Sequence, residues 1–213
     1  MVVNPARTGH SGTMVNGPVP GRVPGNTRDR VLDIAHELFY WKGIRATGVD
    51  AVASAAGVAP PTLYRIFGSK DGLVAAYLER AAEGYLAWME AASAPSVGTP
   101  RDRILALFDA LAEQVRPEHC RGCPFLMALA EYPDEDSAPH RIAVATKSAV
   151  RDRFEALTGE LGAAPGARDL KWLADHLTLV MEGVYASVAA LGTEGPVAVA
   201  RGAAETLLDA ALR

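Results

Sequence analysis

The 213-residue sequence contains only two cysteines and no apolar run long enough to span a membrane. Two cysteines do not make the disulfide scaffold of a small secreted domain. The first residues lack a charged segment followed by an apolar core, so they do not resemble a signal peptide. Together these absences predict a cytoplasmic protein.

The sequence also lacks the patterns that usually carry catalysis or hold cofactors. It has no phosphate-binding Gly-rich loop, no nucleophile elbow and no supported catalytic dyad. Zinc normally takes four nitrogen or sulfur ligands, but the chain has a single CxxC pair, Cys120 and Cys123, with His119 beside it. We therefore expect no enzyme, no cofactor and no metal site.

Composition and charge favour a helical protein with one weakly basic end. Hydrophobic residues make up 49% of the chain, Ala, Leu and Val dominate, and strand-like alternation is scarce, which predicts an all-α fold. The net charge is −4, but residues 1–80 hold nine basic and six acidic residues, a net +3 that leaves −7 for the rest. This asymmetry fits DNA binding at one end, although chance would also produce it.

The stretch 47–70 predicts two short helices joined by a tight turn. Apolar residues recur at helical spacing in the first helix, and Thr47 followed by Asp50 fits a capping box at its start. A glycine ends that helix, and Pro60 and Pro61 open the second, where a missing N–H costs little. This pattern is typical of a helix-turn-helix, which presents its second helix to the major groove of DNA.

The outward positions of the second helix are Thr62, Tyr64 and Arg65. An arginine can pair bidentately with the O6 and N7 acceptors of guanine. Pro60 and Pro61 would read DNA by apolar contact, for instance with thymine methyl groups.

From about residue 27 to residue 78 the chain resembles the DNA-binding domain of the tetracycline-repressor (TetR) family of bacterial regulators. The resemblance runs in continuous order through Phe39, Gly43, Thr47, Val49, Val52, Ala53, Ala56, Gly57, Val58, Thr62, Leu63, Tyr64, Phe67, Ser69 and Lys70. The chain departs from the family at Ala59-Pro60-Pro61, where many relatives carry Lys, Arg or Ser, and at Ile66, where many carry His or Tyr. Because these positions carry no hydrogen-bonding side chains, we expect few hydrogen bonds between this helix and the DNA bases.

Composition and the resemblance together imply the architecture. We expect a disordered tail at 1–26, a three-helix helix-turn-helix domain at 27–74, and a helical ligand-binding and dimerisation domain at 75–213, with about nine helices in all. Helices are expected at 27–42, 70–92, 101–115, 124–131, 139–161, 168–191 and 196–212, besides the two short ones.

The resemblance implies DNA contacts from the first helix, the loop after it, the helix-turn-helix and the start of the next helix. The candidate DNA-binding residues are Arg28, Arg45, Thr47, Pro60, Pro61, Thr62, Tyr64, Arg65 and Lys70. Thr47 is expected both to cap and to donate to phosphate, and Tyr64 and Lys70 to contact the DNA backbone. For Arg28 and Arg45 a plain surface charge is an equally good interpretation.

The last two helices indicate a dimer. The helix at 168–191 is apolar nearly all round, and the helix at 196–212 is rich in small residues. These features fit either a monomer core or a four-helix interface between two subunits, and the family resemblance favours the homodimer.

The rest of the body is expected to hold a pocket for a weakly polar organic effector. The candidate ligand-binding residues are Trp88, Phe108, Phe125, Met127, Trp172, His176 and Tyr185. Taken singly, each is more often a core residue than a pocket residue, and His176 is more often a satisfied core histidine.

These observations predict a ligand-responsive, DNA-binding transcriptional regulator, a repressor released from palindromic double-stranded DNA by a small molecule. One alternative is a thiol-based redox switch that uses Cys120 and Cys123. The family resemblance instead implies that Cys123 is a small buried hydrophobic residue. The other alternative is a helical dimerisation protein that does not bind DNA.

Overall fold

The computed structural model describes residues 26–118, 120–161 and 170–212. In these residues the chain forms nine α-helices and no strand, which confirms the predicted all-α class. The helices are α1 (Thr27–Lys42), α2 (Val49–Ala55), α3 (Pro60–Phe67), α4 (Lys70–Ala92), α5 (Pro100–Gln114), α6 (Pro124–Glu131), α7 (Ala138–Gly159), α8 (Lys171–Leu191) and α9 (Ala198–Ala211). A 3₁₀-helix, η1 (Pro95–Val97), precedes α5, and a π-helical turn, η2 (Thr193–Val197), joins α8 to α9. Apart from Asn26, the tail expected at 1–26 lies outside the described residues.

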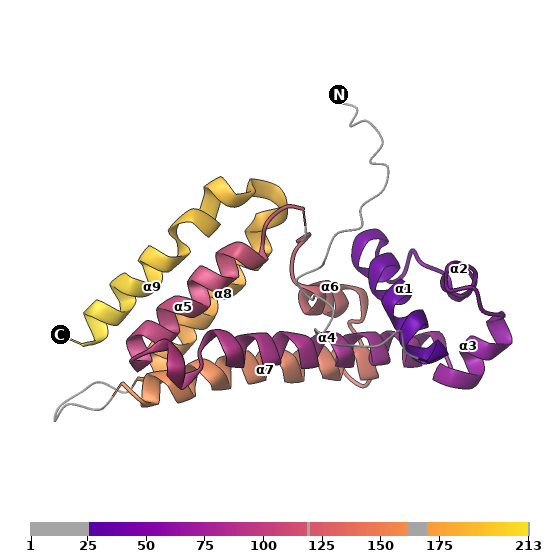
Figure 1. Cartoon of the computed structure of the whole chain (residues 1–213), viewed down its shortest axis with the longest axis horizontal. Helices are drawn as coiled ribbons and strands as arrows, with labels where there is room; N and C mark the ends of the chain where they lie inside the picture. The colour runs from indigo at the N-terminus through magenta and orange to yellow at the C-terminus, as the bar shows by residue number, and fades with distance from the viewer. Residues whose placement is uncertain (1–25, 119, 162–169, 213) are drawn as a thin grey trace.

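The long helix α4 connects the two ends of the molecule (Figure 1). Helices α1, α2 and α3 gather at its N-terminal end, and α7 packs along it. Helices α5, α8 and α9 form the other end, where α9 packs on both α5 and α8. Helix α6 packs on α7 and α4 and lies between the two ends. The chain therefore joins its N-terminal module to its body through a continuous helix.

The start of α2 differs from the prediction. Its N-cap is Gly48, and no side chain accepts a hydrogen bond from the α2 amides described there. The Thr47 hydroxyl instead donates to the carbonyl oxygens of Gly43 (2.8 Å) and Leu38 (3.3 Å) at the end of α1. The capping box of Thr47 and Asp50 is therefore wrong, because the tertiary turn after α1 takes the threonine hydroxyl first.

Helix α3 begins and ends where local chemistry predicts. Pro60 and Pro61 occupy its first turn, and Gly68 follows it with φ 76°, a conformation that favours glycine. Ser69 then caps α4 by accepting a hydrogen bond from the Gly72 amide (3.0 Å). These local signals therefore determine where α3 begins and ends and where α4 begins.

The remaining helices lie within a few residues of their expected bounds, as helix ends commonly fray. The expected start of the helix at 168–191 falls partly on positions outside the described residues. Among the helices that the structure describes, none is both long and apolar enough to cross a membrane.

Candidate functional site

The outer face of α3 carries the side chains predicted to read DNA. Tyr64 is 48% exposed and Arg65 is exposed, while Leu63, the residue before them, is fully buried. Pro60 and Pro61 are exposed at the start of the helix. This face therefore presents one guanidinium, one phenol and two apolar rings to solvent, on a helix held from behind by the core.

Two contacts gather the candidate phosphate-binding residues around α3. The Arg28 guanidinium lies over the Phe67 ring, 5.6 Å from its centroid, which places the start of α1 beside the end of α3. The Lys70 Nζ lies 3.4 Å from the Arg45 carbonyl oxygen and donates to it. The start of α4 and the loop before α2 are therefore neighbours.

Three of the predicted DNA contacts are less exposed than the rest. Thr47 is only 4% exposed, and its hydroxyl already donates within the chain. Thr62 and Lys70 are half-buried. Thr47 therefore lies beneath the surface of the loop before α2, where its hydroxyl ties that loop to the end of α1.

Sequence reasoning missed the residues that join this module to the body. The carboxylate of Glu131, at the end of α6, accepts hydrogen bonds from the amides of Ile44 (3.0 Å) and Arg45 (2.5 Å). The Tyr132 hydroxyl donates to Asp71 at the start of α4 (2.9 Å). These partners lie 61 to 87 positions apart in sequence, so local patterns hold no signal for them.

A second junction lies at the end of α1. The Tyr40 hydroxyl donates to the Gly122 carbonyl oxygen (2.8 Å) and accepts from the Arg121 amide (2.7 Å). The Arg121 guanidinium donates in turn to the carbonyl oxygens of Tyr40 and Trp41. The loop before α6 therefore binds the C-terminal carbonyls of α1, where a cation is favoured by the helix dipole.

The two cysteines belong to this junction. Cys120 and Cys123 are free thiols and both are buried. Burial raises the pKa of Cys120, which disfavours the reactive thiolate at neutral pH. Among the described residues, no group of three His, Cys, Asp or Glu side chains could hold a metal ion. The burial of Cys123 agrees with its interpretation as a small hydrophobic residue.

Three of the candidate ligand-binding residues surround Tyr85 in the body. Its ring centroid lies 5.5 Å from that of Trp88, 6.0 Å from Phe125 and 6.1 Å from Tyr185. The Tyr185 hydroxyl donates to the Gln114 side chain (2.8 Å). This cluster is packed aromatic core with an internal hydrogen bond.

The other candidates lie elsewhere. Phe108 stacks on Phe154 (6.0 Å), and Met127 is half-buried. Trp172 and His176 pair edge to face (5.2 Å) at the start of α8, where His176 is exposed. The expectation of a core histidine is therefore wrong, because His176 lies on the outer side of α8. The ring contacts of Phe108, Trp172 and His176 are therefore with partners other than Tyr85.

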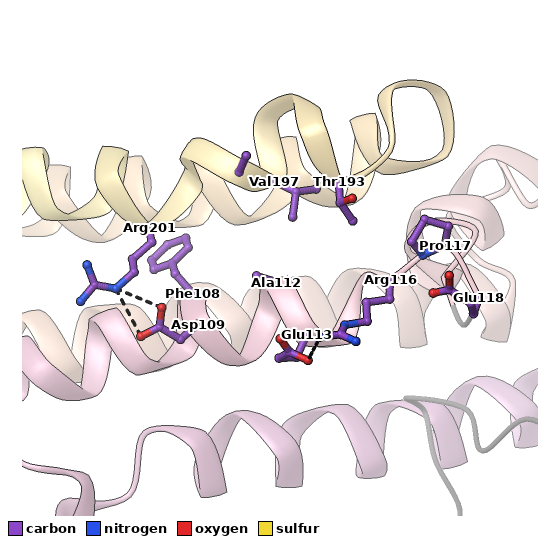
Figure 2. Close-up of a pocket in the computed structure, with 11 residues that line it drawn as sticks. Phe108, Asp109, Ala112, Glu113, Arg116, Pro117, Glu118, Thr193, Val197 and Arg201 are labelled. Carbon is purple, nitrogen blue, oxygen red and sulfur yellow. Dashed lines mark hydrogen bonds and ion pairs between the residues drawn. The ribbon is translucent and has the colours of Figure 1, made fainter.

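A groove of about 540 Å³ lies between α5 and the η2–α9 segment (Figure 2). Its volume is in the range of small-molecule sites. Ion pairs between Arg201 and Asp109 (3.0 Å) and between Arg116 and Glu113 (2.6 Å) lie along it. It is lined by Phe108, Asp109, Ala112, Glu113, Arg116, Pro117, Glu118, Thr193, Val197, Ala198 and Arg201. Phe108 is the member that the sequence also predicts.

Comparison with known proteins identifies the family. Residues 31–77 match the family model of bacterial regulatory proteins, tetR family. The Escherichia coli transcriptional regulator YjdC is 27% identical over 181 residues, which cover 85% of this chain and 93% of that protein.

Two solved Streptomyces structures share the fold over most of their length. SCO4454 from Streptomyces coelicolor, a TetR-family regulator, is 30% identical with a TM-score of 0.81, over 88% of this chain and 96% of that one. The sav143 protein from Streptomyces avermitilis is 31% identical with a TM-score of 0.74, over 88% and 98% of the two chains. The chain therefore belongs to the TetR family of bacterial transcriptional regulators, which bind DNA as dimers.

Proposed function

We propose that the chain is a homodimeric repressor in the bacterial cytoplasm that reads a near-palindromic operator with α3. The outer face of α3 carries this proposal, because Tyr64 and Arg65 project from a helix whose opposite side is buried at Leu63. Arg65 is assigned base contact and Tyr64 phosphate contact. Pro60 and Pro61 add apolar contacts at the start of the helix.

Arg28, Arg45 and Lys70 are assigned to the DNA backbone on either side of α3. Thr47 supports them from beneath, through its hydrogen bonds to the end of α1. The reading module then comprises residues 27–74, and residues 75–213 form the ligand-binding and dimerisation part. Helix α4 belongs to both.

The dimer is proposed to form through α8 and α9. Leu179 is 70% exposed on α8, and Val199 is 64% exposed on α9. Exposed residues continue each stripe at helical spacing: Gly183, Ala186 and Ala190 on α8, and Gly202 and Thr206 on α9. Small residues let helices approach closely, so two such pairs can form a four-helix interface. Two-fold symmetry then places the operator half-sites about 34–36 Å apart or a multiple of it.

The effector is proposed to be a weakly polar small molecule bound in the body. The groove of Figure 2 supports this location, because it combines an apolar floor at Phe108 with charged residues along its sides. A nearly complete switch requires that the effector prefer the DNA-incompetent state by about 5.5 kcal/mol. DNA and effector then weaken each other reciprocally.

The test is selection of DNA fragments by the full chain, followed by gel shifts over a salt series. Arg65→Ala is expected to lose discrimination of about 1–3 kcal/mol at the base that it contacts. Tyr64→Phe is expected to weaken all sequences alike, since it removes a hydroxyl and no charge.

The matched control is Arg151→Ala, which removes the same charge from α7 in the body, where the Arg151 side chain is 42% exposed. If the wild-type protein prefers no fragment, or if Arg65→Ala and Arg151→Ala behave alike, the proposed reading face is wrong.

A further inference from the structure

The last residue of α6 holds the backbone of the loop before α2. Oε1 of Glu131 accepts from the Ile44 amide (3.0 Å), and Oε2 accepts from the Arg45 amide (2.5 Å). Two consecutive amides thus converge on one carboxylate, and hydrogen bonds to an ionised acceptor are about twice as strong as neutral ones. The body therefore binds the reading module directly, through the backbone of Ile44 and Arg45.

The same residue also orients that side chain. The Arg45 Nε donates to the Glu131 carbonyl oxygen (2.8 Å). A guanidinium has five N–H donors, and in the described part of the chain the four on the two Nη atoms of Arg45 donate no hydrogen bond. Arg45 is exposed. Its outer edge is therefore both fixed in direction and free to bind a phosphate bidentately.

A second cation lies beside it. Lys70 Nζ donates to the carbonyl oxygen of Arg45 (3.4 Å), and the neighbouring Asp71 accepts from the Tyr132 hydroxyl (2.9 Å). The end of α6 thus touches both the loop before α2 and the start of α4. Arg45 and Lys70 meet where these two segments come together.

We propose that Glu131 is a positioning residue for DNA binding: it holds the Arg45 guanidinium so that its Nη edge binds one backbone phosphate, with Lys70 beside it. The proposal rests on the proposed function, because it requires that this face meet DNA. It has an unusual consequence, since it makes an acidic side chain strengthen the binding of a polyanion.

The sign of the effect of Glu131→Gln separates positioning from simple electrostatics. Loss of a negative charge near DNA should by itself tighten binding. Glu131→Gln keeps the carbonyl that accepts from Arg45 Nε but removes one of the two carboxylate oxygens that hold the loop backbone. Positioning therefore predicts the opposite: affinity about tenfold weaker and a salt slope reduced by about one unit per subunit, because the loosened loop no longer keeps Arg45 on its phosphate. Both quantities are measured on a fragment selected by the wild-type protein and on an unrelated duplex of equal length.

Glu135→Gln is the matched control. Glu135 is exposed four residues after Glu131, and its substitution removes the same charge. The DNA affinity of Glu135→Gln should equal that of the wild-type protein or be slightly higher. Thermal melting of each variant confirms that it is folded at the assay temperature.

Two further readouts assign the effect to Arg45. Arg45→Ala combined with Glu131→Gln should bind no more weakly than Arg45→Ala alone, because residues that act through one contact are not additive. Hydrogen exchange at the Ile44 or Arg45 amide should also accelerate in Glu131→Gln, since glutamine replaces one of the two accepting oxygens with an NH2 donor.

The outcomes separate the two proposals. If Glu131→Gln binds as tightly as wild type or tighter, the positioning role is wrong, while base discrimination lost in Arg65→Ala would still support the proposed function. If wild type selects no fragment, the proposed function fails. The unrelated duplex then decides the positioning role by itself, because phosphate contacts do not depend on sequence.

Discussion

Thr47 is a test of how a single buried hydroxyl supports the reading module. Its Oγ1 donates to Gly43 and Leu38, so Thr47→Val leaves these carbonyls without that donor. We expect unfolding to become about 1–2 kcal/mol easier in urea, with Thr47→Ser close to wild type. The DNA affinity of the folded Thr47→Val variant should stay within about threefold of the wild-type value, because the buried hydroxyl is not expected to bind a DNA phosphate. A much larger loss of affinity would restore Thr47 as a direct contact.

His36 predicts a pH dependence of stability. The pKa of His36 is lowered from 6.5 to about 4, mainly by burial and in second place by the nearby positive charge of Arg80. The negative charge of Asp33 acts in the opposite direction. The unfolded chain binds a proton as pH falls below 6.5, whereas the folded chain does not until about pH 4. Stability is therefore full above pH 6.5 and is lost between 6.5 and 4, by at most about 3 kcal/mol.

The pH effect is measured as the urea midpoint against pH for wild type and His36→Phe. Phenylalanine preserves a ring beside Tyr40 and Tyr77 and cannot titrate. The loss between pH 6.5 and 4 should be smaller in the variant. Identical curves for the two proteins would contradict the assignment to His36.

Cys120 and Cys123 are expected to resist modification in the native protein. Both are buried, and burial raises the pKa of Cys120. A colourimetric thiol reagent at neutral pH should therefore react slowly until denaturant is added. Fast labelling of the native protein, with loss of DNA binding, would favour the redox switch instead.

The junction between α3 and α4 depends on the conformation of one glycine. Gly68 has φ 76°, and a Cβ built there would meet nothing within 4 Å. Gly68→Ala should therefore destabilise the fold by about 1 kcal/mol through backbone strain alone. In thermal unfolding, the matched change Gly84→Ala should have the opposite sign, because Gly84 lies inside α4 with equally open space. Equal shifts for the two variants would show that φ at Gly68 does not matter.

At the scale of the whole molecule, the proposed dimer interface lies on α8 and α9. Leu179→Glu places a charge at the most exposed large apolar side chain of α8, so we expect a monomer by light scattering. Operator affinity should fall by about 100-fold, because each subunit then binds a half-site alone. Val144→Glu is the control, since Val144 is exposed on α7. A Leu179→Glu protein that stays dimeric would place the interface elsewhere.

The sequence alone determined the features that depend on neighbouring residues. Helix α3 begins at Pro60 and Pro61 and ends before Gly68, and α4 is capped by Ser69. Apolar periodicity predicts the ends of the long helices to within a few residues. These signals are local, because a cap, a proline or a positive φ acts within one turn of helix.

Tertiary structure decided what the side chains do. Thr47 has a capping pattern, yet the end of α1 takes its hydroxyl, and His176 lies on the outer face of α8. Glu131 meets Ile44 and Arg45 only after α6 has packed beside the reading module, across more than 80 positions of sequence. Such contacts follow from how whole helices bury their apolar faces against one another, and no local pattern of residues encodes that arrangement.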